Sequence, residues 1–514
     1  MRDAIIGIDI GTTNTKGVLA STAGKLIEVA SREATLYSPE PTWAEGDVLQ
    51  WWANTKSILA ELVSAAGSDY RIKALGVSGM VPTLIPLDAV GAPLRRSIQQ
   101  NDARASAQIA ELESRYGQDR FFAHTGGSIN QQVLAPKLRW LAQHEPAVFE
   151  RAAVFCGSYD YIAYRLTGEL YAEHNWALES GLLDIVTNDW SEELLALGGI
   201  DAARVPRVRA SHEIVGEVGQ AAAAETGLPV GTPVIAGVAD HVASAFAAGA
   251  SNDGDLLLKY GGAGDILYSL ASLETDPRLY IDHHVVPGHY YLNGCMATSG
   301  SLVKWFAATF CSTDEVAASR TGQPLYAYLD RQAAALPPGS DGLVLLPYFL
   351  GEKTPLHDTF ARGTIVGLGL NHGRHHLFRA VLEGVAYGFR HHVDVLQELS
   401  LAPARILASD GGAASDLWLQ ITADVLGRPV LRVIGHPGSS LGAAFVAGKA
   451  VGLFDDWSEV GRFVTLSAPF EPRSAAQAAY GEYYGLYRET YERLVEMYPR
   501  LAAVRDRVGV AETS

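Results

Sequence analysis

The chain opens with a strand, a turn and a second strand, which read Ala4-Ile5-Ile6-Gly7-Ile8-Asp9-Ile10, Gly11-Thr12-Thr13-Asn14 and Lys16-Gly17-Val18-Leu19-Ala20. The first segment is β-branched and apolar, as buried strands are, and the small residues that follow suit a hairpin turn. The turn offers backbone N–H groups and two hydroxyl groups to phosphate oxygens, and Asp9 can hold Mg²⁺ through water. An ordinary hairpin with no ligand is the alternative interpretation.

The same pattern returns near the middle of the chain. Asp255-Leu256-Leu257-Leu258-Lys259-Tyr260 is strand-like, Gly261-Gly262-Ala263-Gly264 is a turn, and Asp265-Ile266-Leu267-Tyr268 forms the return strand. Two such units indicate an internal duplication at the scale of a domain, with a boundary within residues 249–254. The strands and helices between them alternate, including a helix over 47–66, a strand over 72–78 and a long closing helix from about 475. This alternation predicts an α/β protein.

The composition excludes several classes of protein. Of the 514 residues, 48% are hydrophobic, which is too apolar for a disordered chain. The 40 basic and 57 acidic residues give a net charge of −17, which opposes binding to nucleic acid or to an anionic membrane. The three cysteines are scattered, so we expect neither a disulfide framework nor a structural zinc site. We expect the protein to be cytoplasmic.

Three further stretches carry candidate site residues. Asp240 follows the strand-like run 233–239, where it could act as a general base for a hydroxyl group or simply cap a helix. Asp410-Gly411-Gly412 joins a strand to a helix, and its glycines would let adenine or ribose lie against the backbone, or would only form a turn. The polar run 99–104 suits hydrogen bonds to a polyhydroxy compound, or is a solvated loop.

The order of these motifs is more specific than any one of them. After the opening hairpin come Asn101-Asp102-x-Arg104, Gly237-x-x-Asp240, the second glycine hairpin, Gly351-Glu352-Lys353-Thr354-Pro355, Asp410-Gly411-Gly412 and Gly442-Ala443-Ala444. Over essentially the whole chain this order resembles the FGGY family of carbohydrate kinases, the relatives of xylulose and glycerol kinases. The segment 367–383 is similar to the second of the two signatures of that family.

The resemblance implies two actin-like (ribonuclease H-like) α/β domains with duplicated mixed-sheet cores and a nucleotide cleft between them. Residues 1–249 would bind the sugar and supply the catalytic base, and residues 250–514 would bind adenosine. Asp240 would be the base, Asp9 would face Mg²⁺ through water, and Asp240 is a second candidate metal ligand. The phosphate and nucleotide contacts would come from Gly11, Thr12, Thr13, Lys16, Gly261, Gly262, Gly264, Gly411, Gly412 and Gln420. The sugar contacts would come from Met80, Gln100, Asn101, Asp102, Arg104, Gln132 and Asp240.

The chain departs from the family pattern around the substrate. Where xylulose kinases typically have Ser-Gly-Gln-Met-His-Gly, this chain has Ser78-Gly79-Met80-Val81-Pro82-Thr83, and Gln100 replaces the Trp of the motif Trp-x-Asp-x-Arg. A pocket that hydrogen-bonds hydroxyl groups rejects analogues that lack them, so a natural substrate other than glycerol or plain D-xylulose is expected. The second hairpin also lacks the two hydroxyl groups of the usual Gly-Thr-Ser-Gly.

The expected activity is ATP-dependent phosphorylation of a small sugar or polyol, with a xylulose-like pentulose preferred and with ATP and Mg²⁺ as cofactors. A kinase of glycerol, a tetritol or another polyol is the alternative. An ATP-binding regulator on the actin-like fold, without kinase activity, is the alternative from a different class. The expected partners are the sugar and ATP, with no nucleic acid and no membrane, and the expected assembly is a homodimer.

Overall fold

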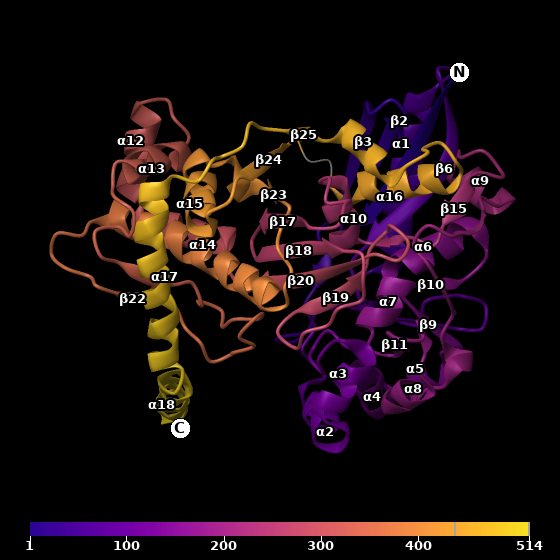
Figure 1. Ribbon diagram of the computed structural model, residues 1–514. Helices are drawn as coiled ribbons and strands as arrows, with labels where there is room; N and C mark the ends of the chain where they lie inside the picture. The colour runs from indigo at the N-terminus through magenta and orange to yellow at the C-terminus, as the bar shows by residue number, and fades with distance from the viewer. Residues whose placement is uncertain (436–437, 512–514) are drawn as a thin grey trace. The chain divides into compact units, whose positions relative to one another are not determined.

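The computed structural model describes residues 1–435 and 438–511 and divides into two compact units (Figure 1). Unit 1 comprises Met1–Ser251, Ala271–Tyr291 and Pro437–Val464, and unit 2 comprises Asn252–Leu270, Leu292–His436 and Thr465–Ser514. The chain first passes from unit 1 to unit 2 within the stretch 249–254, where the sequence indicated a boundary. The compact units are nevertheless interleaved, whereas the expected ranges 1–249 and 250–514 are contiguous, because two later segments return to unit 1.

Unit 1 is built on a mixed sheet with the strand order β14-β15-β6-β1-β2-β3. Its central strands are β1 (Arg2–Ile10), β2 (Asn14–Ser21), β3 (Leu26–Glu33) and β6 (Tyr70–Gly79), flanked by β15 (Pro233–Ile235) and β14 (Ile214–Glu217). Strand β1 runs antiparallel to β2 and parallel to β6, and the short β16 (Val238–Ala239) also pairs with β6 in parallel. The predicted opening hairpin is therefore present.

Helix α16 (Ser439–Ala450) packs directly on this sheet because glycines leave room for its backbone. A Cβ atom at Gly7 on β1 would lie 1.8 Å from the carbonyl oxygen of Ser440, and one at Gly76 on β6 would lie 2.1 Å from that of Ala443. Figure 1 shows the yellow α16 against the indigo strands of unit 1, although more than 350 residues separate them in the sequence. This late segment thus completes the core of unit 1.

Helix α1 (Val48–Ala66) covers the other face of the sheet. Successive strand residues point to opposite faces, and Gly17, the neighbour of Ile8 on β2, faces Ile58 of α1 while Gly7 faces α16. The Asp47 side chain caps the helix by accepting hydrogen bonds from the N–H groups of Leu49 and Gln50. The helix predicted over 47–66 is confirmed.

Unit 2 repeats the plan of unit 1. Its strands lie in a second mixed sheet in the order β20-β18-β17-β23-β24-β25. Strand β17 (Asp255–Tyr260) runs antiparallel to β18 (Gly264–Leu270) and parallel to β23 (Arg405–Ser409). This matches the relation of β1 to β2 and β6, so the predicted duplication and the two mixed-sheet α/β cores are confirmed. The other strands of the order are β20 (Tyr290–Met296), β24 (Val430–Ile434) and β25 (Thr465–Leu466).

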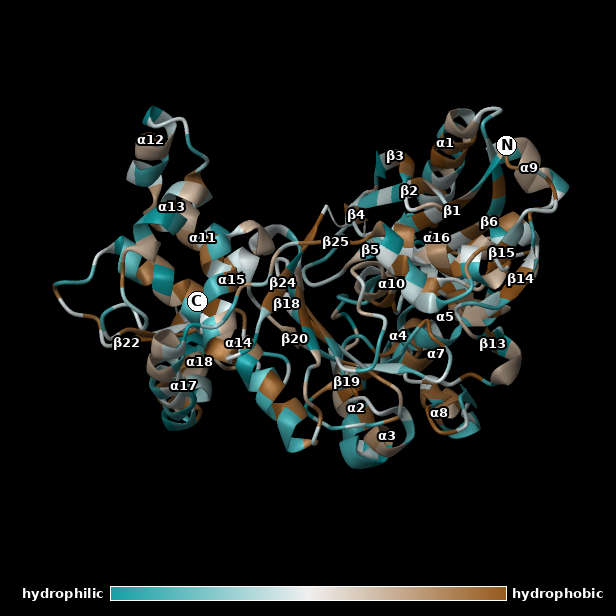
Figure 2. Cartoon of the chain, turned by 45° about the horizontal axis from the view of Figure 1, so that its top comes forward, coloured by the Kyte–Doolittle hydropathy of each residue, from teal (hydrophilic) through white to brown (hydrophobic). Residues whose placement is uncertain are grey.

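Further helices complete both units. In unit 1 they are α2 (Ser106–Tyr116), α3 (Gln118–Thr125), α4 (Leu134–His144), α5 (Pro146–Arg151), α6 (Ser158–Thr167), α7 (His174–Glu179), α8 (Glu192–Gly198), α9 (Gln220–Thr226) and α10 (Asp240–Ala247). In unit 2 they are α11 (Gly300–Phe310), α12 (Ser312–Arg320), α13 (Leu325–Ala334), α14 (Arg374–Glu398), α15 (Asp416–Leu426), α17 (Ser474–Leu494) and α18 (Met497–Ala511). In Figure 2 the helices α2 and α3 carry both teal and brown residues, as amphipathic helices do.

The remaining short strands are β4 (Leu36–Tyr37), β5 (Glu45–Gly46), β7 (Ile85–Leu87), β8 (Ser97–Ile98), β9 (Val154–Cys156), β10 (Tyr171–Glu173), β11 (Leu183–Asp184), β12 (Asp189–Trp190), β13 (Arg207–Arg209), β19 (Tyr280–His283), β21 (Val344–Leu346) and β22 (Thr364–Val366). The predicted closing helix is α17, which buries Tyr480, Tyr484 and Tyr487. Among the described residues, the structure has no helix with the length and hydropathy needed to span a bilayer.

Candidate functional site

The carboxyl ends of three parallel strands bring the acidic candidates of unit 1 together. Asp9 on β1 is paired in register with Ser78 on β6, and Val238 on β16 is paired with the same serine. The hydroxyl group of Ser78 donates to Asp9 Oδ1 at 2.9 Å. Since Asp240 follows β16 directly, it begins α10 at the edge of the sheet where Asp9 lies.

The pKa of Asp9 is affected by the nearby charge of Asp240. Burial and then repulsion from Asp240 raise the pKa of Asp9 to about 6, while hydrogen bonds from Ser439 and Ser78 and the charge of Lys16 oppose the rise. Lys16 is paired with Asp9 across the β1–β2 hairpin, and Ser439 is the first residue of α16. Thus two carboxylates repel each other beside a hairpin that carries one lysine.

This pair of carboxylates fits the metal role that the sequence predicts for it. Mg²⁺ prefers oxygen ligands, often one or two carboxylates together with phosphate oxygens and water. A divalent cation beside Asp9 and Asp240 would remove the repulsion that raises the pKa of Asp9. The assignment of Asp9 and Asp240 to Mg²⁺ stays a prediction.

Asp240 begins its helix but does not cap it. The N-cap of α10 is Ala239, and Asp240 is the first helical residue, so the alternative role of N-cap is wrong. The side chain of Asp240 is 38% exposed, and its Oδ1 accepts a hydrogen bond of 2.6 Å from the N–H of His241. An accessible carboxylate that is already oriented by the backbone suits a general base.

A cluster beside Asp240 has no signal in the sequence. Glu179, His241 and Asp282 place their ligand-type atoms within 4.8 Å of one another. Although burial opposes it, the carboxylates of Asp282 and Glu179 raise the pKa of His241 well above its usual range, and His241 Nε2 lies 3.1 Å from Asp282 Oδ2. The resulting imidazolium already supplies a positive charge between the acids. Residues 179, 241 and 282 are too far apart in sequence for spacing to connect them.

The opening turn is ordered by its own backbone. The N–H of Gly11 donates to the carbonyl of Asn14 at 3.0 Å. Thr12 is half-buried and its hydroxyl contacts the sulfur of Met80 at 3.0 Å, while Thr13 is exposed. The candidate phosphate hairpin therefore touches the candidate sugar-binding residue Met80, which is itself buried at 2% exposure.

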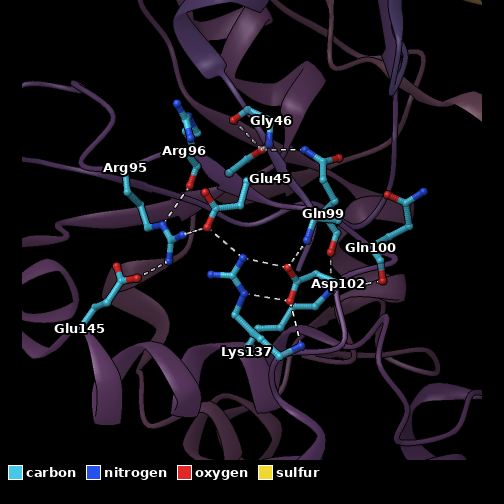
Figure 3. Close-up of polar contacts among 12 residues, drawn as sticks. Glu45, Gly46, Arg95, Arg96, Gln99, Gln100, Asp102, Lys137 and Glu145 are labelled. Atoms are coloured by element: carbon cyan, nitrogen blue, oxygen red, sulfur yellow. Dashed lines mark hydrogen bonds and ion pairs between the residues drawn. The ribbon is translucent and has the colours of Figure 1, made fainter. Parts of the chain in front are cut away.

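The predicted substrate loop is anchored by its charged residues (Figure 3). Asp102 is fully buried and accepts hydrogen bonds from Ala44 N at 2.6 Å and from Arg104 Nε at 2.8 Å. The Arg104 guanidinium lies against the rings of Trp43 and Trp140, at 3.9 and 4.9 Å from the two ring centroids. A solvated loop is therefore wrong for these two residues.

The polar residues around this anchor have different exposures. Gln100 and Gln132 are half-buried and Asn101 is exposed, so their side chains stay candidates for contact with the sugar. The side chains of Asp102 and Arg104 are engaged with each other and with the fold, and this geometry favours a role in holding the loop over direct contact with the sugar.

The second glycine hairpin, in unit 2, is held by the start of α11. The carbonyl of Gly262 accepts hydrogen bonds from Ser299 N at 2.9 Å, Ser301 N at 3.1 Å and the Ser301 hydroxyl at 2.7 Å. A Cβ atom at Gly300 would lie 2.5 Å from the carbonyl oxygen of Gly261. Ser301 thus places a hydroxyl group beside the turn that lacks its own, and sequence comparison of the turn alone could not find it.

The Asp410-Gly411-Gly412 turn joins β23 to a short 3₁₀ helix ahead of α15. Asp410 has a backbone φ of 71°, which is strained for a residue with a side chain. Gly411 is exposed, with no atom within 4 Å of the position of a Cβ atom, whereas a Cβ atom at Gly412 would lie 2.7 Å from Trp418. An open glycine backbone suits a flat ligand. The Gln420 amide donates to Asp424 and to the carbonyl of Glu471, at 3.0 and 2.8 Å.

The duplicated cores, each with a glycine hairpin on its central strands, and the acidic pair beside the first hairpin define a phosphotransferase of the actin-like fold class. Residues 4–247 match the N-terminal domain of the FGGY family of carbohydrate kinases, and residues 275–451 match its C-terminal domain. The chain belongs to this family and is a kinase that phosphorylates a sugar with ATP.

Relatives that match nearly the whole chain agree with this assignment. The chain is 30% identical to a xylulose kinase of Bacillus subtilis over 98% of its length and 99% of that protein. The structure of a xylulose kinase from Rhodospirillum rubrum is 46% identical and superposes with a TM-score of 0.90, covering 96% of this chain and 99% of that one. A gluconate kinase structure from Lactobacillus acidophilus is 26% identical with a TM-score of 0.90, covering 98% and 100%. Relatives with different sugars therefore share this fold.

Proposed function

We propose that the sugar is a xylulose-like pentulose, that Asp240 is the general base and that ATP bound with Mg²⁺ is the phosphoryl donor. The observation that carries the proposal is the accessible Asp240 carboxylate, fixed by the N–H of His241 and close enough to Asp9 to raise its pKa. The relatives named xylulose kinase support the choice of sugar.

The proposed reaction assigns a role to each group. A sugar hydroxyl group is too weak an acid to attack unaided, so Asp240 accepts its proton as the oxygen bonds to the γ-phosphorus. The bond from that phosphorus to the β-phosphate oxygen breaks, and ADP leaves. Bound Mg²⁺, held by Asp9 with Asp240 as a second candidate ligand, would neutralise charge on the phosphate oxygens. Lys16 and the backbone N–H groups of Thr12 and Thr13 would bind the phosphate next to Asp9, while Gly11, whose N–H donates to Asn14, would shape the turn.

The nucleotide contacts in unit 2 are proposed from its own geometry. Gly261, Gly262 and Gly264 would bind phosphate through their backbone, and the Ser301 hydroxyl, which donates its one proton to the carbonyl of Gly262, would hold this turn in place. The exposed Gly411 and the neighbouring Gly412 would lie against adenosine. Gln420 is a weaker candidate because its amide nitrogen already donates to two protein oxygens.

The proposal is tested by ADP release over a panel of ketopentoses, pentitols, tetritols, glycerol and gluconate. A ketopentose should give the highest kcat/KM. Asp240→Ala should lower kcat at least about 10²-fold, as the loss of a general base does. Calorimetry with ATP checks that the variant still binds nucleotide. A variant that turns over as fast as the wild type would remove Asp240 from the mechanism.

One observation favours a second candidate for the substrate. The apolar run Met80-Val81-Pro82 favours a polyol other than xylulose, and the same panel would show it as a higher kcat/KM for a tetritol, a pentitol or glycerol.

The setting of the reaction is also a proposal. The three cysteines are free and the net charge is −17, which agrees with a cytoplasmic enzyme whose partners are the sugar and ATP rather than nucleic acid or membrane. We propose a homodimer, which light scattering coupled to size exclusion would test.

A further inference from the structure

A fully buried lysine lies under the predicted substrate loop. Lys137, on α4, is 0% exposed, and its ammonium donates to the carbonyls of Gln99 at 2.7 Å and of Gln100 at 3.4 Å (Figure 3). It also donates to the carbonyl of Gln132 at 3.4 Å. An ammonium group has three N–H donors, so main-chain oxygens from two separate loops take all of them. Lys137 therefore joins these two loops to one point on α4.

The same helix holds the loop in a second way. Trp140, one turn after Lys137, stacks on the Arg104 guanidinium, and Arg104 is in turn paired with Asp102. In addition, the N–H of Gln99 donates to the carbonyl of Ala44 at 3.0 Å. Several contacts thus fix the backbone at residues 99–104.

A buried charge needs a reason, because taking an ammonium group out of water costs several kcal/mol and an apolar side chain would fill the same space without that cost. The groups that Lys137 orients point to the reason. Gln100 and Gln132, whose carbonyls it binds, are the half-buried amides predicted to contact the sugar, and Gln100 Oε1 is buried without a hydrogen-bond partner in the structure.

We propose that Lys137 is a positioning residue for sugar recognition: its ammonium fixes the backbones of Gln99, Gln100 and Gln132 so that the amides of Gln100 and Gln132 are presented to the sugar hydroxyl groups. The proposal deepens the proposed function and rests on it for the identity of the ligand. Lys137 touches neither reacting group and acts through the two glutamines.

The protonation of Lys137 gives this role a measurable signature. Burial lowers the pKa of Lys137 to about 7; Asp102 opposes this shift and Arg104 adds to it. The other charged groups of this cluster are Glu45, Arg95 and Glu145. A neutral amine has two N–H donors and a lone pair, and the lone pair would face a carbonyl oxygen. The loops are therefore held by three hydrogen bonds below about pH 7 and less firmly above it.

The test is Lys137→Met, which keeps the length of the side chain and removes the donors. We expect the KM for the sugar to rise about tenfold, the KM for ATP to stay within about twofold, and kcat to fall less than the KM rises. In the wild type the KM for the sugar should rise about fivefold between pH 6 and pH 8.5, the equivalent of about one net hydrogen bond, and the variant should lose this dependence.

Arg139→Met, on the same helix, is the matched control. Arg139 bonds to Glu111 and to the carbonyl of Leu197 rather than to the two loops, so both KM values should stay unchanged. Equal rises of the two KM values in Lys137→Met, or an unchanged KM for the sugar, would overturn the proposal. Lys137→Gln, which keeps two donors, serves if the methionine variant does not fold.

Hydrogen exchange separates this inference from the proposed function. In Lys137→Met the amides of residues 97–104 and 128–133 should exchange faster than in Arg139→Met, with no substrate present. If the wild type phosphorylates no sugar, the proposed function fails while the exchange data still decide whether Lys137 holds the loops. Unchanged exchange in both segments would overturn the role of Lys137 even in an active kinase.

Discussion

Glu352 shows how one buried carboxyl group can couple the stability of unit 2 to pH. It is 5% exposed, and its Oε1 accepts hydrogen bonds of 2.8 Å from the N–H groups of Ala297 and Lys353. Burial raises the pKa of Glu352 to about 7, although these hydrogen bonds and the charge of Lys353 oppose the rise. The folded state therefore holds this proton more tightly than the unfolded state does.

The sign of the pH dependence follows from that raised pKa. The contribution of Glu352 to stability is complete below its unfolded pKa, near 4.5, and is lost as the pH rises through about 7. In Glu352→Gln the amide oxygen can accept the same two hydrogen bonds without titrating. Between pH 4.5 and pH 8, the free energy of unfolding of the variant should therefore rise relative to that of the wild type by on the order of 3 kcal/mol.

Urea unfolding at several pH values measures this gain. Glu492→Gln, on an exposed position of α17, is the matched control and should track the wild type at every pH. A constant difference between Glu352→Gln and the wild type would show that Glu352 is not protonated in the folded state near neutral pH.

Among single residues, the sequence predicted those whose roles depend on local order and missed those that depend on pairing across the chain. Asp9 and Asp240 stand at the ends of recognisable strands, so their candidacy could be read directly. Glu179 and Asp282 approach His241 only after a helix and a returning strand have been placed. Ser301 reaches the second hairpin from α11, nearly forty residues later, and no local pattern indicates it.

At the scale of elements, the contact of α16 with the sheet depends on the absence of side chains. Alanine at position 7 would place its Cβ atom 1.8 Å from a backbone carbonyl of α16, and neither partner is a flexible side chain. The helix must move, and such overpacking costs about 1–3 kcal/mol. Because Ser439 at the start of α16 hydrogen-bonds Asp9, the same movement should disturb the acidic pair.

Gly7→Ala should therefore lower both the free energy of unfolding and kcat. Urea unfolding and ADP release measure the two effects. Gly481→Ala, in α17, is the control: no atom lies within 4 Å of its Cβ position, and alanine favours the helix by about 1 kcal/mol. A Gly7→Ala enzyme with the stability and kcat of the wild type would contradict the close packing of α16.

Elements with strong periodicity were predicted well because their signals are local. The two hairpins and α1 follow from runs of apolar residues and from turn chemistry, and the duplication follows from the recurrence of the hairpin. The register was beyond prediction, because the pairing of Asp9 with Ser78 and of Ser78 with Val238 is set by packing among strands far apart in sequence. The segment 99–104 shows the same limit. Its polar residues fit a solvated loop, but in the structure the segment packs against α4.

At the scale of the whole molecule, the interleaving of the two units predicts what a fragment can do. A chain that ends at residue 251 lacks 271–291, which carries Asp282, and 437–464, which contains α16. Without α16 the apolar face of β1 and β6 is exposed to water. We expect this fragment to unfold without a cooperative transition and to bind a hydrophobic dye.

Circular dichroism during heating and dye fluorescence measure this expectation. The control fragment carries residues 271–291 and 437–464 appended through flexible linkers, and it should regain a cooperative transition. A cooperative transition in the simple fragment, near the temperature of the control, would show that unit 1 does not need the returning segments.

The return of α16 also sets the order in which the protein can be completed on the ribosome. Domains generally fold as units, the N-terminal one first, while the rest of the chain is still being made. Unit 1 cannot fold completely at that stage, because the helix that packs on Gly7 and Gly76 begins near residue 440. Unit 1 therefore stays incomplete until nine-tenths of the polypeptide has been synthesised. Until then the nascent chain exposes the apolar strands of its opening hairpin, and exposed apolar strands of this kind are prone to aggregation.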